Sequence, residues 1–276
     1  MTDTLELTGL GMGTWGLGED PKNKKDEISS LRYGLDNGIK IIDTAEMYGE
    51  GKSESLVGEA IKGYSRSDLF LITKFYPYHG TPELERQSLE NSLKRLGTDY
   101  VDLYLLHWRG HKRLSDTVRG LQALQKEGLI HHWGVSNFDI ADMEELMTVP
   151  GGEECFANEV LYNVSKRGVE FDLLPWQREK HINFIAYSPF NSGGGDTIRI
   201  TNNLKMVARH HHATPHQIML AWTMRSRNIL TIPKASNVKH MKENLAAVKI
   251  KLDDEDLALL NADFPQPTTK QALEMI

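Results

Sequence analysis

The feature that most restricts the fold of this chain is a regular alternation of short apolar runs with amphipathic segments. Eight such runs occur: TGLGMGTW, IKIIDTA, LFLITKF, YVDLYLLHW, IHHWGVSNF, CFANEVLYN, INFIAYSPF and NILTIPKAS. Apolar runs of this length are typical of parallel strands buried on both faces. The repeat from run to run is about 30 residues, which is the size of one βαβ unit. The pattern therefore predicts a parallel α/β sheet.

Segments with helical periodicity separate the runs. The predicted helices cover 25–37, 53–63, 83–96, 114–127, 140–147, 173–180, 204–211 and 216–227. Thr81 and Pro82 suit an N-cap and a first helical position, and Gly97 stands where that helix should end. Eight strand–helix units in 276 residues match the (β/α)8 or TIM barrel, which typically has about 250 residues. We expect one barrel domain, residues 1–276, with the active site at the C-terminal rim of the strands.

A glycine motif near the N-terminus suggests a different fold. Gly11, Gly13 and Gly16 form a G-x-G-x-x-G, which binds dinucleotides where a helix opens at the third glycine. Here LGEDPKNKK follows, and Pro21 interrupts it. We expect these glycines to allow tight packing in the first strand. A Rossmann-type dehydrogenase stays an alternative that the strand arrangement would exclude.

Composition excludes several partners and sites. The net charge is −6 with both signs interspersed, so we expect no nucleic-acid partner. Cys155 is the single cysteine, which rules out an intrachain disulfide and a cysteine metal cluster. No signal-peptide pattern opens the chain, and no stretch approaches the roughly 18 apolar residues of a membrane span. We expect a cytoplasmic monomer without a membrane partner.

The histidine run 210–212 invites a metal site, but a helix there argues against one. Consecutive helical side chains point about 100° apart, so we expect His210, His211 and His212 not to share one ion. A loose surface site with His216 is conceivable, although a solvated face is favoured. The sequence therefore predicts no metal.

Polar side chains end every one of the eight runs. In a (β/α)8 barrel all these ends meet at one rim, where the chemistry lies. In chain order the residues are Thr14 and Trp15, Asp43, Lys74, His107, Ser136 and Asn137, Asn158 and Glu159, Tyr187 and Ser188, and Lys234. Three consecutive strands supply an aspartate, a lysine and a histidine, so we expect those side chains to converge.

Tyr48 follows Asp43 closely enough to reach the same point. A phenol has a pKa near 10, which makes it a poor proton donor at neutral pH. An adjacent ammonium lowers that pKa, and a carboxylate holds the ammonium in its charged form. The combination of Tyr48 with Lys74 and Asp43 therefore predicts a phenol whose pKa is lowered, so that it can donate a proton.

These residues occur in longer motifs that resemble the signatures of the aldo-keto reductase superfamily. The motifs are IIDTAEMYGEGKSESLVGEA, LYLLHW, WGVSNF and IPKASNVKHMKENLAA, and the resemblance runs from about Gly11 to the C-terminus. NEVLYNVSKRGVEFDLLPW is most similar to the bacterial branch that reduces methylglyoxal and related small aldehydes. The resemblance implies that a nicotinamide cofactor gives hydride to a carbonyl while a tetrad of Tyr, Asp, Lys and His delivers the proton.

The resemblance gives each tetrad residue a role. Tyr48 is implied as the general acid, with Lys74 and Asp43 tuning it and His107 orienting the carbonyl. The implied substrate-binding residues are Trp15, Tyr48, His107 and Trp108. Nearby loops are short, which suits small aldehydes, ketones and dicarbonyls better than bulky steroids.

The resemblance also implies the cofactor site. The residues are Gly13, Thr14, Ser136, Asn137, Glu159, Tyr187, Ser188, Lys234, Asn237, His240, Glu243 and Asn244. Ser136 and Asn137 match contacts to the carboxamide, and Tyr187 matches the residue that stacks on the nicotinamide ring. Lys234 matches the partner of a 2′-phosphate, so NADPH is expected and NADH remains possible.

Two positions depart from the family pattern. Glu159 stands where the family usually has Gln, and an ionised carboxylate cannot donate to the carboxamide oxygen. His240 stands where many NADPH-preferring members have Arg, so a bidentate phosphate contact is lost. Both changes leave dual cofactor use open.

A second function is compatible with the same motifs. Potassium-channel β-subunits share the fold and the tetrad and act as nicotinamide-binding regulatory subunits. We expect the enzyme, since no additional N-terminal segment is present for a partner to engage.

Overall fold

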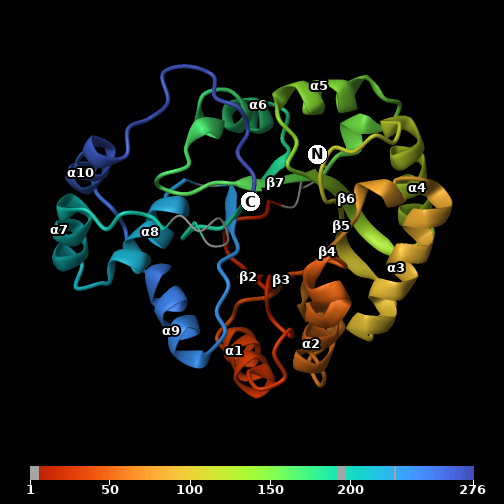
Figure 1. The fold of residues 1–276 in the computed structure, drawn as a ribbon, viewed down its shortest axis with the longest axis horizontal. Coiled ribbons are helices and arrows are strands. Elements are labelled where there is room, and N and C mark those ends of the chain that lie inside the picture. The colour runs from red at the N-terminus through yellow and green to blue at the C-terminus, as the bar shows by residue number, and fades with distance from the viewer. Residues whose placement is uncertain (1–5, 192–196, 227) are drawn as a thin grey trace. The chain divides into compact units, whose positions relative to one another are not determined.

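The computed structural model describes residues 6–191, 197–226 and 228–276 (Figure 1). The chain divides into two compact units. Unit 1 comprises Met1–Leu10, Glu159–Pro233 and Lys242–Ile276, and unit 2 comprises Gly11–Asn158 and Lys234–Met241. We describe each unit separately, and the expected single domain stays a prediction.

The strands match the eight predicted runs. They are β1 (Gly9–Leu10), β2 (Met12–Gly13), β3 (Ile41–Asp43), β4 (Phe70–Phe75), β5 (Val101–Leu106), β6 (Ile130–Ser136), β7 (Ala157–Leu161), β8 (Asn183–Tyr187) and β9 (Ile229–Thr231). They form one sheet in the order β1-β9-β8-β7-β6-β5-β4-β3-β2. The first predicted run contains two strands, because β1 pairs with β9 while β2 pairs with β3, both in parallel.

The helices match the eight predicted segments and add two. They are α1 (Lys24–Asp36), α2 (Lys52–Ala60), α3 (Pro82–Leu96), α4 (Leu114–Lys126), α5 (Ile140–Thr148), α6 (Leu173–Glu179), α7 (Asn202–His210), α8 (Pro215–Thr223), α9 (Val238–Ala247) and α10 (Asp254–Asp263). Helices α9 and α10 have no counterpart among the predicted segments. Helix α8 ends at Thr223, before the predicted end at position 227, which lies outside the described residues.

Unit 2 contains a regular succession of strands and covering helices. β2 to β6 pair in chain order, each parallel to the next. Every residue of β5 is buried, as expected for a strand covered on both faces. Outside the sheet α1 packs on α2, α2 on α3 and α3 on α4 (Figure 1). This arrangement brings the C-terminal ends of β3, β4 and β5 side by side.

Helix α3 illustrates why the local sequence specifies these elements. Thr81 is extended at the N-cap, Pro82 takes the first position, and Gly97 ends the helix in the left-handed conformation with a φ of 69°, as predicted. Leu89, Leu93 and Leu96 are buried along one stripe. Each fully buried leucine contributes roughly 2 kcal/mol of transfer free energy, so this face holds the helix in place.

Unit 1 contains β1, β8, β9 and most of β7 together with the later helices. β8 pairs in parallel with β9, and the segment before β1 is tied to β8 because Leu7 N donates to Asn183 Oδ1 at 2.7 Å. α7 packs against α8 and against α10. Across the described part of the chain, no helix has both the length and the apolarity to cross a membrane.

Candidate active site

A buried ion pair joins the ends of β3 and β4 in unit 2. Lys74 Nζ lies 2.7 Å and 2.6 Å from the two carboxylate oxygens of Asp43, and it donates to Thr44 O at 3.1 Å. Both charged side chains are almost completely buried. Charges removed from water are tolerated only when paired and hydrogen-bonded, and this lysine meets that condition. The carboxylate therefore holds the Lys74 ammonium in a fixed position.

Tyr48 lies directly against this pair. It opens a short 3-10 turn, Tyr48–Gly51, that follows β3 and begins with a bond from Tyr48 N to Ala45 O at 3.1 Å. Gly49 and Glu50 then take positive φ angles of 56° and 55°, so the chain reverses sharply. The buried phenol OH lies 3.3 Å from Lys74 Nζ. A cation at this distance favours negative charge on the phenol oxygen.

His107 completes the group at the end of β5. His107 N donates to Phe75 O at 3.1 Å, and the imidazole meets the Tyr48 ring edge-on with centroids 5.8 Å apart. Burial, followed by the charge of Lys74, lowers the pKa of His107 to about 3. The imidazole is therefore neutral at physiological pH. Its Nδ1 is buried without a hydrogen-bond partner among the described residues.

Aromatic side chains extend outward from this group. Trp108 lies 5.1 Å from the His107 ring and meets Tyr76 edge-on at 6.0 Å. Tyr76 in turn stacks on Tyr78 at 4.7 Å, and Tyr78 is 56% exposed. Sequence reasoning found Trp108 but missed the two tyrosines. Tyr76 directly follows the run LFLITKF and Tyr78 comes two residues later, much as Trp108 follows its own strand, so the same signal was available.

Trp15 behaves differently from the other predicted pocket residues. It is 42% exposed and makes no ring contact with any residue that the structure describes. Its neighbours Gly13 and Thr14 instead support β3, because Gly13 pairs with Asp43 and Thr14 Oγ1 donates to Asp43 O at 2.8 Å. The Thr14 hydroxyl is buried and accepts a bond from Ser53 at 2.7 Å.

Ser136 and Asn137 stand at the end of β6. Asn137 has a left-handed φ of 56°, and its Nδ2 donates to His107 O at 3.1 Å and to Ser136 Oγ at 3.2 Å. The polar pair thus lies next to the tetrad. They do not cap the next helix, because α5 begins with a capping box formed by Asp139 and Asp142.

Lys234 and Asn237 lie between β9 and α9, and His240 lies in the first turn of α9. Ser30 Oγ in α1 holds this segment by bonds to Ala235 O at 2.8 Å and Asn237 O at 3.1 Å. Asn237 Oδ1 accepts from His240 N at 3.0 Å, which satisfies one free N–H of the first turn of α9. Lys234 and His240 are exposed. No ion pair links Lys234 to any described residue.

The remaining predicted cofactor residues lie in unit 1. Glu159 is buried in β7, and Tyr187 and Ser188 are half-buried at the end of β8. Ser188 has a φ of 51°, and its carbonyl accepts from Asn163 Nδ2 at 3.0 Å. In α9, Asn244 is buried and Glu243 is half-buried.

The residues present are chemically suited to a nicotinamide dinucleotide. The Ser136 hydroxyl and the Asn137 amide can bond a carboxamide, and the phenol ring of Tyr187 is half exposed. The exposed Lys234 stands just before the amino end of α9, where charge and free N–H groups favour phosphate. The donor set therefore fits such a cofactor.

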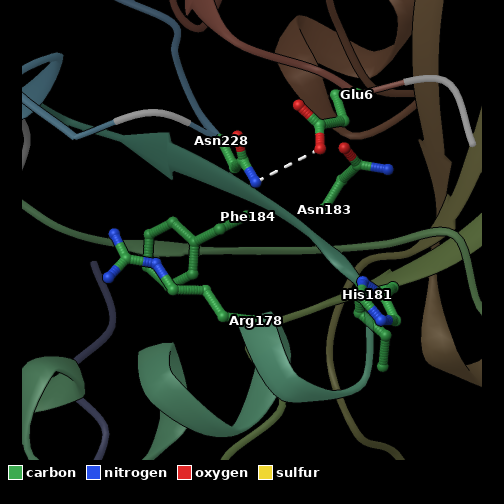
Figure 2. Close-up of a pocket in the computed structure, with 7 residues that line it drawn as sticks. Glu6, Arg178, His181, Asn183, Phe184 and Asn228 are labelled. Carbon is green, nitrogen blue, oxygen red and sulfur yellow. Dashed lines mark hydrogen bonds between the residues drawn. The ribbon is translucent and has the colours of Figure 1, made fainter.

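A small cavity occurs elsewhere, in unit 1, and is not the active site. It has a volume of about 40 Å³ and is lined by Glu6, Arg178, His181, Ile182, Asn183, Phe184 and Asn228 (Figure 2). Asn228 Nδ2 donates to Glu6 Oε1 at 3.4 Å across it (Figure 2). It adjoins the first residues of β8, whereas barrel chemistry lies at the C-terminal ends of strands. Its size leaves no room for an organic substrate.

Comparison with known proteins gives a consistent result. The profile of the Aldo/keto reductase family matches residues 9–262. Methylglyoxal reductase YeaE of Escherichia coli K12 is 41% identical over 99% of this chain and 96% of its own length. Glyoxal reductase of Bacillus subtilis is 32% identical, covering 95% of this chain and 93% of its own.

Solved structures agree. An aldo/keto reductase from Klebsiella pneumoniae in complex with NADP and acetate superposes with a TM-score of 0.95 at 41% identity, covering 98% of this chain and 96% of that chain. The predicted (β/α)8 fold is confirmed, as is the similarity to bacterial methylglyoxal reductases, and the Rossmann alternative is excluded. The family also supports the prediction of a nicotinamide cofactor. This chain belongs to the aldo/keto reductase family and is an oxidoreductase.

Proposed function

We propose that the protein reduces small aldehydes and dicarbonyls of the methylglyoxal type to alcohols with NADPH. The observation that carries this proposal is the buried contact of the Tyr48 hydroxyl with Lys74 Nζ at 3.3 Å. A proton donor is needed wherever a carbonyl becomes an alcohol, and this phenol has a fixed ammonium beside it. The names of the bacterial relatives support the substrate class.

The chain's own side chains account for the proton transfer. When bound, the reduced nicotinamide supplies hydride to the carbonyl carbon. Tyr48 gives its hydroxyl proton to the carbonyl oxygen, and the ammonium of Lys74 stabilises the phenolate that remains. Asp43 keeps that ammonium in position through both carboxylate oxygens.

His107 has a different part in the proposal. With a pKa of about 3 it is a neutral imidazole, which can donate one N–H hydrogen bond. It therefore orients the carbonyl oxygen, and Tyr48 supplies the proton. Trp108, packed against the imidazole, and Tyr76, packed against Trp108, provide an apolar wall for the remainder of a small substrate.

For the cofactor, we propose NADPH with Ser136, Asn137 and Glu159 at the carboxamide and Tyr187 on the ring. Gly13, Thr14 and Ser188 complete the nicotinamide and pyrophosphate contacts, and Asn237, His240, Glu243 and Asn244 those of the adenosine end. Lys234 supports the choice of NADPH, because an exposed lysine without an ion pair among described residues suits a 2′-phosphate. NADP-bound and NADPH-bound relatives support it too.

The first test is Tyr48→Phe. We expect NADPH binding to persist, measured by quenching of tryptophan fluorescence, while methylglyoxal reduction falls by at least about 100-fold. Tyr64→Phe is the matched control, since that hydroxyl bonds Asp36 on the surface. An unchanged rate of methylglyoxal reduction in Tyr48→Phe would show that Tyr48 is not the proton donor.

The same assay distinguishes a reductase from a nicotinamide-binding regulatory subunit. Sustained NADPH consumption by the wild-type protein with methylglyoxal or a panel of aldehydes supports catalysis. A single slow turnover per molecule would instead support the regulatory alternative.

A further inference from the structure

Three metal-ligating side chains meet in unit 1 where the end of α7 packs on the start of α10. His210 Nδ1 lies 3.0 Å from Asp256 Oδ1, and His211 Nε2 lies 2.6 Å from Asp256 Oδ2. One such atom from each residue lies within 4.8 Å of the other two. None of the three takes part in the proposed reaction.

This convergence differs from the expectation that consecutive helical histidines point apart. His210 is the last residue of α7, and His211 is its C-cap with φ −91° and ψ 6°. The two ring centroids are nevertheless only 4.8 Å apart. Both rings reach the Asp256 carboxylate, because His210 contacts it through its near nitrogen Nδ1 and His211 through its far nitrogen Nε2. A difference in reach therefore compensates for the difference in direction.

We propose that His210, His211 and Asp256 bind a divalent first-row transition-metal ion such as Zn²⁺, with the fourth position open to solvent. Imidazole nitrogen and carboxylate oxygen are Zn²⁺ ligands at about 2.0–2.2 Å, which sets tetrahedral ligand atoms roughly 3.3 Å apart. The present spacings are those of imidazoles hydrogen-bonded to a carboxylate. Binding requires the contact between His210 Nδ1 and Asp256 Oδ1 to lengthen slightly from 3.0 Å, and ligand atoms now up to 4.8 Å apart to come closer. His210 can move because its side chain is 59% exposed.

The carboxylate is already oriented by its surroundings. The Asp256 side chain is only 3% exposed, and Asp256 forms a capping box with Asp253. Asp253 N donates to Asp256 Oδ2 at 3.1 Å, and Asp256 N donates to Asp253 Oδ1 at 2.9 Å. Asp256 Oδ1 then serves as the ligand while Oδ2 keeps its backbone bond, an outer contact of the kind that orients metal ligands.

The charges around the three residues also favour a cation. Asp253, Asp254 and Glu255 are exposed beside Asp256. The carboxyl end of α7 adds the negative end of a helix dipole next to the histidines. The proposed ion would thus fasten α7 to α10.

Calorimetric titration of Zn²⁺ into untagged, chelator-stripped full-length protein tests the proposal. We expect one equivalent to bind, and His210→Asn and His211→Asn each to weaken the affinity by more than about 100-fold, the upper range for loss of a mere outer-shell partner. His212→Asn is the matched control: it adjoins the site, and Asn tolerates its left-handed φ of 49°.

A second measurement guards against misfolding in the variants. Excess Zn²⁺ should raise the Tm of the wild type and of His212→Asn, but not that of His210→Asn. His210 is exposed, so its replacement leaves the core intact. Absence of stoichiometric binding to the wild type, or equal affinity in all three variants, would overturn the proposal and leave a hydrogen-bonded contact between helices.

Discussion

Lys74 shows how much depends on individual side chains in this protein. It is completely buried, yet two Asp43 oxygens, the Thr44 carbonyl and the Tyr48 hydroxyl surround its ammonium. Each partner is specified by its position at or just after a strand end. Sequence reasoning therefore placed the tetrad correctly in space, although the catalytic roles stay predictions. What it could not supply was the neutral state of His107, which arises from burial.

A prediction at the scale of a single residue concerns His240 and the choice between NADPH and NADH. His240 is exposed on the first turn of α9, where its backbone N–H is held by Asn237. Under the proposed function, His240→Arg should tighten NADPH at least about tenfold relative to NADH, because a guanidinium bonds phosphate bidentately. Fluorescence titration with both nucleotides measures this. Equal changes for both would locate the 2′-phosphate elsewhere.

At the scale of elements, patterns within short windows were sufficient for most of the fold. Every predicted strand and helix is present. A strand buried on both faces has a continuous apolar run, and a helix buried on one side has an apolar stripe, so both can be recognised from adjacent residues. Helix α10 was not predicted because its leucines form no clear stripe: Leu257 and Leu260 share a face, but Leu259 lies off it. Its capping box, Asp253 with Asp256, was the signal that could have revealed it.

Helix α3 holds a buried acid that the sequence did not single out. Both carboxyl oxygens of Glu85 are buried without a hydrogen-bond partner among described residues, and Oε2 faces Gly120 of α4 so closely that a Cβ there would lie 2.0 Å away. Burial, followed by the charge of Glu83, raises the pKa of Glu85 to about 9. The residue is therefore a neutral carboxylic acid at physiological pH.

This acid makes stability dependent on pH. The folded state keeps a proton that the unfolded chain releases above its ordinary pKa of 4.5, so the unfolding free energy falls as pH rises from there to about 9. The slope contributed is at most about 1.4 kcal/mol per pH unit. Urea unfolding across this range should show that Glu85→Gln removes this contribution to the slope. Glu90→Gln, on the exposed side of α3, should retain it; a wild-type slope persisting in Glu85→Gln would contradict the assignment.

At the scale of the whole molecule, the two compact units share elements. Strand β7 begins in unit 2 and ends in unit 1, and α9 does the same. A break between the units would cut both elements. We therefore expect one cooperative urea transition, with tryptophan fluorescence and far-ultraviolet circular dichroism changing together. Separate midpoints for the two signals would show that the single-domain prediction was wrong.

The sequence by itself determined which segments become strands, in what order they follow, and which polar residues end them, since periodicity and capping are written in adjacent residues. Only the tertiary structure decided that Tyr76 meets Trp108 edge-on, that Glu85 is buried without a hydrogen-bond partner among the described residues, and that two neighbouring histidines turn toward Asp256. These depend on distances between residues far apart in the chain, which packing sets and local pattern does not encode.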